Sequence, residues 1–421
     1  MIKGLFDFIK SSPTAYQAIS AVSCRLEKEG YVRLYEDEEF LLSEGGKYYT
    51  VRNGTSLIAF RIPSLKMGFM ITATHSDSPA FKLKESEEKK GVYTRLDVEK
   101  YGGMIYYSWL DRPLGIAGRV LVDTGNGVES VNVDLGCDAV TVPSVAIHLN
   151  RGVNDGYKFN PATDLLPLYS VGESLGVMEA IANKIGVDKK EILSHDLFVY
   201  NREEPRTIGL NGDFILSPRL DDLECVYASL EGFLNSEKSE SVPVLAIFDN
   251  EEVGSATKQG ADSNFLLATL KKIAGENYFK MLENSLMVSA DNAHALHPNH
   301  PELSDSQNAP ILGGGVVIKF NASQRYATDG LSCALFKKIC NNAGVKVQPY
   351  YNRADIAGGS TLGSIADTRV SIPTVDIGFA QLAMHSACET ASAGDLVEMV
   401  KALRLFYSVS LLRHGEKTEI K

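Results

Sequence analysis

The sequence predicts an α/β protein in which a domain with a mostly parallel sheet, residues 1–79 and 211–421, is interrupted by a β-rich insertion, residues 80–210. Two observations support this prediction. Apolar runs alternate with helical patterns in both outer segments, and buried strands that alternate with helices are typical of a parallel sheet covered on both faces. In the middle segment, short β-type stretches are instead separated by glycine-rich turns.

The composition excludes several classes of protein. Hydrophobic residues make up 44% of the 421 residues, enough to bury the core of a globular protein. The chain has neither the apolar core of a signal peptide nor an uncharged apolar run of about 18 residues, so we expect no contact with a membrane. The six cysteines are scattered without a CxxC pair, which predicts free thiols in the cytoplasm. The net charge of −11 includes no basic block, which argues against nucleic acid as a partner.

The N-terminal elements follow from spacing. Residues 1–30 predict a helix, with a start signal at 11–13 and apolar residues at helical intervals afterwards: Ala15, Ile19, Val22 and Leu26. Two apolar runs then predict strands over 55–63 and 68–83. The second run leads directly into His75 and Asp77, and the carboxyl end of a buried strand is where open α/β sheets place their sites.

The insertion and the C-terminal part differ in pattern. Within the insertion, four segments predict short strands, and a helical stretch is expected near 172–195; the strand segments are 93–103, 118–125, 128–134 and 140–149. After Gly212, strands and helices alternate again. The expected strands lie in 242–255, 284–296, 315–320 and 370–380, with a helix over 331–344.

Acidic and histidine residues follow several of these apolar strands. They are His75 in THSDSP, Glu251 and Glu252 in AIFDNEEVGS, Asp291 in VSADNAHAL and His385 in AMHS, joined by Asp221 in SPRLDD near a helix start. Each residue taken alone is more often structural than functional. Together they form a complete ligand set, because imidazole and carboxylate groups suit zinc and related divalent ions.

The chemistry expected from this set is hydrolysis. Two ions about 3.5 to 4 Å apart would hold a water and lower its pKa toward about 7. A carboxylate that is not on the metal must move the proton, and we assign this role of general base to Glu251 and ligation to Glu252, although the residues alone allow the reverse order. Asp77, two residues beyond His75, is expected to orient its imidazole.

Six motifs occur in one order along nearly the whole chain: THSDSP, SPRLDD, DNEEVGS, SADNAHALHPNH, KFNASQRYATD and QLAMHS. As a set they resemble the aspartyl aminopeptidase family of di-metal peptidases. The resemblance implies a catalytic domain of the zinc-exopeptidase type, interrupted by a β-rich dimerisation domain. It also implies a homo-oligomer in which dimers assemble into a tetrahedral dodecamer.

The resemblance further implies a role for each matching residue. The two metal ions are expected to be zinc, with cobalt or manganese as alternatives: His75 and Asp291 would hold one, Glu252 and His385 the other, and Asp221 both, with Glu251 as the base. Three residues are expected to contact the peptide substrate. Lys319 would face an acidic side chain, His294 would line the pocket, and His148 would reach a neighbouring subunit's site.

The chain departs from the eukaryotic pattern of that family at two places. IAGGSTLGS replaces a Cys-Gly-Thr-Thr version, and Asp222 stands where the pattern has Asn. The expected function is therefore release of N-terminal residues, Asp or Glu by preference, with a neutral-residue aminopeptidase or a deacylase on the same scaffold as the alternative. A third hypothesis, from another class, is an assembly protein that kept the fold and lost activity.

Overall fold

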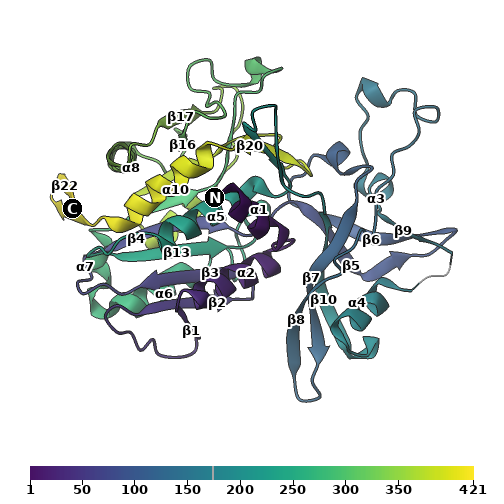
Figure 1. Ribbon diagram of the computed structural model, residues 1–421, viewed down its shortest axis with the longest axis horizontal. Coiled ribbons are helices and arrows are strands. Elements are labelled where there is room, and N and C mark those ends of the chain that lie inside the picture. The colour runs from purple at the N-terminus through teal and green to yellow at the C-terminus, as the bar shows by residue number, and fades with distance from the viewer. Residues whose placement is uncertain (173–174) are drawn as a thin grey trace.

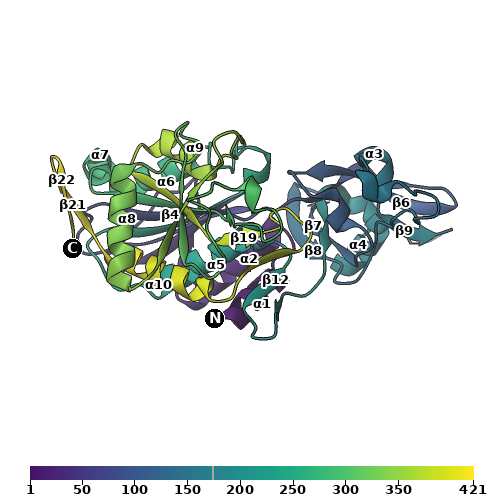
Figure 2. The same ribbon diagram turned by 90° about the horizontal axis from the view of Figure 1, so that it is seen from above.

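The structure is a computed structural model that describes residues 1–172 and 175–421; residues 173–174, inside the predicted insertion, lie outside the described part. The chain forms two bodies that lie side by side along the long axis of the molecule (Figures 1 and 2). One is built on a nine-stranded sheet flanked by helices, and the other on a six-stranded sheet. The predicted α/β class is thus confirmed. In the described residues no helix has the length and apolarity that a membrane crossing requires.

The nine-stranded sheet has a parallel centre. In spatial order it consists of β1 Val32–Leu34, β2 Lys47–Arg52, β3 Ser56–Arg61, β13 Val242–Phe248, β4 Phe69–His75, β14 Leu286–Ala290, β18 Thr374–Gly378, β16 Val316–Phe320 and β17 Val347–Tyr351. Strands β13, β4, β14 and β18 run parallel to their neighbours in this group. Their residues are all buried, as apolar strands covered on both faces must be.

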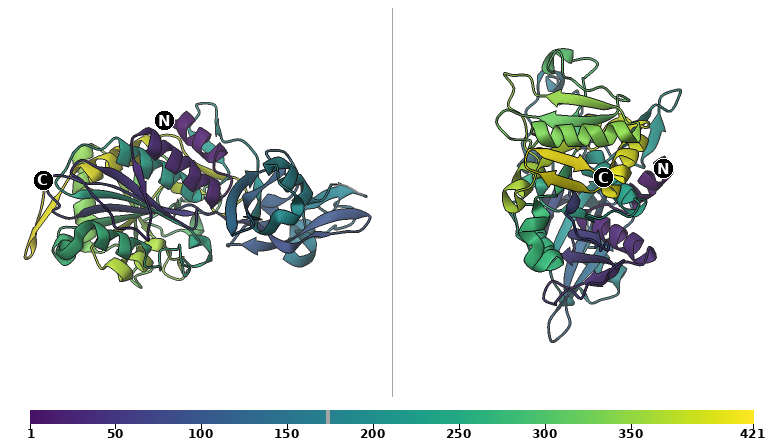
Figure 3. Two further views of the ribbon diagram at one scale, coloured as in Figure 1. Left: turned by 90° about the horizontal axis from the view of Figure 1, so that it is seen from below. Right: turned by 90° about the vertical axis from the view of Figure 1, so that its left-hand side faces the viewer.

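Helices cover both faces of this sheet (Figure 3). One core contains residues of α1 Ile2–Lys10, α2 Ala15–Lys28, α5 Leu220–Leu234, α8 Gly330–Ala343 and α10 Asp395–Ser408. The other contains residues of α6 Phe265–Ala274, α7 Tyr278–Leu282 and α9 Leu362–Val370. The single helix predicted over 1–30 is two helices, because Pro13 cannot continue the first one and the chain restarts at Ala15.

The six-stranded sheet is antiparallel throughout. Its order is β8 Val128–Asp134, β7 Leu114–Asp123, β10 Ile192–Asn201, β5 Ala80–Lys89, β6 Tyr93–Tyr101 and β9 Leu168–Val171. The short helices α3 Pro161–Asp164 and α4 Val177–Ile185 accompany it, and α4 packs into a separate apolar core. The helix expected near 172–195 is therefore much shorter than predicted, since the chain turns at Gly186 and continues as β10.

The strand predicted over 140–149 is wrong. Only isolated bridges occur there, at Val140, Thr141 and Val142. Pro143 has no N–H to donate to a ladder, and from this residue on the segment is exposed and irregular. His148 consequently lies on a loop of the insertion rather than on a strand.

Two small sheets complete the fold. One has five strands, in the order β11 Arg206–Ile208, β12 Phe214–Ser217, β20 Glu389–Ser392, β19 Ala380–Leu382 and β15 Ala293–His294. The other is the C-terminal hairpin of β21 Leu411–His414 and β22 Lys417–Ile420. The five-stranded sheet leads the chain from the insertion into α5, and it brings β20 beside that helix start.

Candidate metal centre

The candidate centre lies at the carboxyl ends of the central parallel strands. His75 is the last residue of β4 and pairs in register with Phe248, the last residue of β13. Asp291 follows β14 directly, and the short 3-10 helix Glu251–Val253 begins three residues after β13. Because parallel strands end at one edge of the sheet, residues distant in sequence meet there.

One group of donor atoms surrounds His75. Its Nε2 lies 3.4 Å from Oδ1 of Asp221 and 4.0 Å from Oδ1 of Asp291. Asp222 completes this group, and its Oδ2 also accepts a hydrogen bond of 3.0 Å from the backbone N–H of His75. One ligand atom from each of the four residues lies within 4.8 Å of the others.

A second group shares Asp221 with the first. His385 Nε2 lies 3.5 Å from Oδ2 of Asp221 and 3.4 Å from Oε2 of Glu252. The two oxygens of Asp221 thus face different histidines. All five residues predicted as ligands are brought together in these two groups.

The residues fit a divalent cation. Several buried carboxylate oxygens have no hydrogen-bond partner among the described residues, namely Oδ1 of Asp221, Oδ1 of Asp222 and Oε1 of Glu252. A buried carboxylate oxygen without a hydrogen bond is unfavourable unless a cation compensates it. Burial raises the pKa of Glu252 well above its ordinary value, although the neighbouring His385 lowers it. The negative charge of this cluster, together with its imidazole and carboxylate donors, is what a zinc-type ion requires.

Glu251 and Asp77 border the cluster without belonging to either ligand group. Burial raises the pKa of Glu251 to about 8, against the lowering effect of His75. Asp77 Oδ1 lies 3.4 Å from His75 Nδ1 and accepts a 3.2 Å hydrogen bond from the backbone N–H of Glu251. Asp77 therefore links the histidine to the turn that carries both glutamates.

The three residues expected to contact substrate differ in placement. Lys319 is only 1% exposed, so it is not a surface lysine; its Nζ donates a 2.7 Å hydrogen bond to the backbone oxygen of Asp291. His294 is exposed on β15, two residues beyond Asn292. His148 is exposed on the insertion loop and makes no hydrogen bond within the described part of the chain, so the single chain does not bring it to the cluster.

Sequence reasoning missed one buried carboxylate that holds the cluster together. Glu389, at the start of β20, accepts a 2.8 Å hydrogen bond from the backbone N–H of His385 through Oε1. Its Oε2 accepts another of 3.1 Å from the backbone N–H of Asp221. The only signal was an acidic residue four positions beyond a candidate ligand, and the link to Asp221 depends on tertiary structure.

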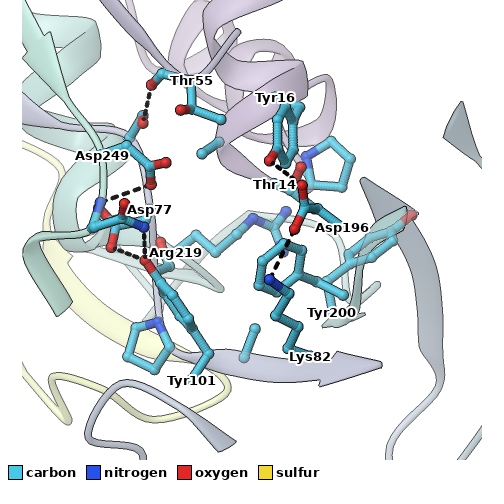
Figure 4. A pocket seen from close by; sticks show the side chains of 18 of the residues that line it. Thr14, Tyr16, Thr55, Asp77, Lys82, Tyr101, Asp196, Tyr200, Arg219 and Asp249 are labelled. Atoms are coloured by element: carbon cyan, nitrogen blue, oxygen red, sulfur yellow. Dashed lines mark hydrogen bonds and ion pairs between the residues drawn. The ribbon is translucent and has the colours of Figure 1, made fainter. Parts of the chain in front are cut away.

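A cavity of about 320 Å³ is lined by residues of both bodies (Figure 4). The insertion contributes Lys82, Tyr101, Arg119 and Asp196 to its wall, among others, and the larger body contributes Asp77 and Asp221. Lys82 and Arg119 both pair with Asp196, at 2.8 and 3.0 Å. The cavity thus reaches the centre from the side of the insertion.

Comparison with known proteins gives consistent results. Residues 8–407 match the family model described as aminopeptidase I zinc metalloprotease (M18). The chain is 41% identical over 423 residues to a probable M18 family aminopeptidase 2 of Clostridium novyi (strain NT), which covers 96% of this chain and 98% of that protein.

Solved structures have the same fold. The structure in the cryo-EM complex of Ape4 and Nbr1 has a TM-score of 0.93 and 33% identity, covering 96% of this chain and 85% of that chain. The mApe1 dodecamer of S. cerevisiae has a TM-score of 0.83 and 27% identity, covering 96% of each chain. The likeness therefore extends over both bodies of the molecule.

Proposed function

This chain belongs to the M18 family of zinc aminopeptidases, and on that premise we propose that it releases N-terminal residues from peptides, Asp or Glu by preference, with two metal ions at the strand ends. One observation carries the two-metal proposal: Asp221 belongs to both groups of candidate ligands. A carboxylate whose two oxygens face two ligand sets is suited to hold a pair of ions.

In this proposal His75 and Asp291 hold one ion, Glu252 and His385 the other, and Asp221 both. Zinc is the proposed metal, with cobalt or manganese as alternatives. When bound, such ions supply Lewis acidity, which lowers the pKa of water and stabilises negative charge on a carbonyl oxygen. Glu389 keeps the backbones of Asp221 and His385 in place for this arrangement through its two hydrogen bonds.

The proton transfers are assigned to Glu251. Its carboxylate takes the proton from the attacking water and delivers it to the leaving amine. The position of Glu251 suits this double role, because its carboxyl borders the ligand groups without belonging to either and so stays free to exchange a proton. Asp77 orients the ring of His75, and its contact with the backbone of Glu251 keeps base and ligand at a constant separation.

We assign the preference for N-terminal Asp or Glu to Lys319. Its buried ammonium lies beside Asp291 and contributes positive charge next to the ligand set. The same contact favours a second candidate. Because Asp291 already engages the ammonium, a neutral-residue aminopeptidase is the principal alternative. His294, exposed on β15, is proposed to line the pocket on the substrate side.

We also propose that the insertion, residues 80–210, pairs two chains and that dimers build a tetrahedral dodecamer. Support comes from the dodecameric mApe1 and from the apolar residues exposed around His148, with Leu149 83% and Val145 58% exposed. His148 would then reach the partner chain's site. Leu149→Asp should reduce the mass measured by light scattering to a smaller species, whereas a wild-type protein that is already monomeric would refute the assembly.

The proposed location is the cytoplasm. All six cysteines lie in the described part of the chain and are free thiols, which is the state expected in a reducing compartment.

The experiment that tests the function is a panel of peptides with different N-terminal residues, including N-acylated ones. The panel is assayed after chelation and after zinc, cobalt or manganese is restored. Metal-restored cleavage of N-terminal Asp and Glu supports the whole proposal. Preference for neutral or acylated substrates would replace the specificity, and no cleavage with any metal would favour the inactive assembly protein.

A further inference from the structure

The segment Tyr101–Gly103 connects the insertion to the candidate metal centre. It leaves the end of β6 in the six-stranded sheet and continues into the 3-10 helix Tyr106–Trp109. Each of its three residues meets a different residue of the centre. We propose that this segment, here named the insertion strap, is a positioning element that sets the affinity of the centre for its metal, an inference that rests on the proposed two-metal function.

The first contact is made by Tyr101. Its hydroxyl donates a 2.7 Å hydrogen bond to Oδ2 of Asp77 and accepts one of 2.9 Å from Nδ2 of Asn250 (Figure 4). The ring is held from the insertion side by Phe198 on β10, at 5.5 Å between ring centroids in an edge-to-face arrangement. Tyr101 therefore connects the insertion to the buried carboxylate of Asp77 in the other body.

Asp77 passes this restraint on to the metal ligands. Its carboxylate lies 3.4 Å from His75 Nδ1, whose hydrogen-bond partner is the Asp77 backbone oxygen at 3.1 Å. The carboxylate also accepts hydrogen bonds of 3.2 Å from the backbone N–H groups of Glu251 and Glu252. A carboxylate held by a charge-assisted hydrogen bond from a hydroxyl keeps one orientation. Without the Tyr101 hydroxyl, the carboxylate keeps only its two hydrogen bonds from backbone N–H groups and is held less firmly beside the histidine.

The second contact requires glycine. Gly102 has a φ of +75°, and a Cβ at this position would lie 3.1 Å from Cβ of Glu252 and 3.3 Å from its Oε2. The strap thus lies directly on the side chain of a candidate ligand. An alanine there would be strained at this φ, and its Cβ would force the Glu252 side chain to shift by a few tenths of an ångström.

The third contact determines the tautomer of His385. The carbonyl oxygen of Gly103 lies 2.7 Å from Nδ1 of His385, and because a carbonyl can only accept, Nδ1 carries the proton. The lone pair of Nε2 is then free to bind a metal on the side of Asp221 and Glu252. The backbone N–H of Ile105 also donates a 3.0 Å hydrogen bond to the carbonyl oxygen of His385.

The test uses the full-length protein with Tyr101→Phe and Gly102→Ala, which disturb two separate contacts of the strap. The controls are Tyr93→Phe, an exposed tyrosine at the other end of β6, and Gly186→Ala, whose φ of +78° is similar but whose Cβ would meet nothing within 4 Å. Zinc affinity is measured by competition with a chromogenic chelator, alongside thermal unfolding of the metal-free proteins and kcat and KM in excess zinc.

Tyr101→Phe should bind zinc about 10- to 100-fold more weakly than wild type, as is usual when a group that orients a ligand is removed. Gly102→Ala should also bind zinc more weakly, because its Cβ shifts the side chain of a candidate ligand. Both controls should bind like wild type, and KM should change less than kcat. Strap variants with wild-type zinc affinity, or controls weakened as much as the strap variants, would overturn the strap alone. A wild-type protein that binds no divalent metal would overturn the proposed function as well.

Discussion

Lys319 and Asp291 form a buried pair in which Nζ of the lysine lies 2.7 Å from the backbone oxygen of the aspartate and 3.5 Å from its Oδ2. Asp291 also belongs to the group of candidate metal ligands around His75. The charge proposed to select substrates is therefore also part of the electrostatic balance of the metal centre. An experiment on Lys319 must therefore distinguish selection of the substrate from support of Asp291.

Lys319→Met is expected to lower the preference for N-terminal Asp and Glu over neutral residues by about 10- to 100-fold, the value of one lost hydrogen bond to a charged group. The measurement is kcat/KM for matched acidic and neutral peptides. Lys337→Met, an exposed lysine on α8, is the control. An equal loss for both classes of peptide would assign Lys319 to the support of Asp291 and not to selection.

Glu251→Gln should decrease kcat by about 10²- to 10⁴-fold while the protein keeps its metal, because the amide can neither take nor return a proton. Glu251 lies outside both ligand groups, so metal content measured by mass spectrometry should not change. Glu240→Gln, an exposed glutamate before β13, serves as the control. Turnover near that of wild type would reject Glu251 as the base, and lost metal would make it a ligand.

Asp221→Asn should reduce binding of both ions, whereas His385→Asn should reduce binding of one. The reason is that Asp221 belongs to both groups of donors and His385 to a single group. Metal stoichiometry after dialysis against a fixed free zinc concentration distinguishes the two variants. If Asp221→Asn lost one ion only, the aspartate would not be shared.

Stability at acid pH should depend on His195, which lies far from the ligand groups in sequence and is buried on β10. Burial lowers the pKa of His195 below its ordinary value, and neither ring nitrogen has a partner among the described residues. The unfolded chain therefore binds this proton more readily. Above the unfolded pKa of about 6.5 this histidine does not change the free energy of unfolding. As the pH falls from about 6.5 toward the folded pKa, His195 lowers the free energy of unfolding by at most about 1.4 kcal/mol per pH unit.

Urea unfolding of metal-free protein at pH 7.5 and 5.5 measures this effect. His195→Leu should decrease the difference in unfolding free energy between the two pH values. His414→Leu, an exposed histidine on β21, is the matched control. An unchanged difference in His195→Leu would show that other groups cause the acid sensitivity.

The fold class could be predicted because the central strands β4, β13 and β14 are short, mostly apolar and end at or just before polar residues. His75 ends such a strand, and Glu251, Glu252 and Asp291 closely follow one, so each was recognisable from its position. The prediction of a strand around His148 was wrong because an apolar pattern alone does not show that the residues are buried. Alternating apolar residues there indicate a half-buried surface, yet residues 143–149 are exposed within the part of the single chain that the structure describes.

Local patterns also could not identify residues whose role depends on distant partners. Glu389 acts through the backbones of His385 and Asp221, and Tyr101 acts through Asp77 from a different sheet. The local sequence around each of these residues resembles that of an ordinary strand and gives no sign of its role.

The amino-acid sequence alone determined which segments form buried strands, and hence which histidines and carboxylates stand at their ends, because apolar periodicity and strand termini are local properties. Tertiary structure decided which oxygen faces which nitrogen, that Asp221 is shared between two groups, and that the insertion places Tyr101–Gly103 against the centre. These relationships arise when parallel strands align their carboxyl ends and a second body packs against that edge, bringing together side chains that are remote along the chain.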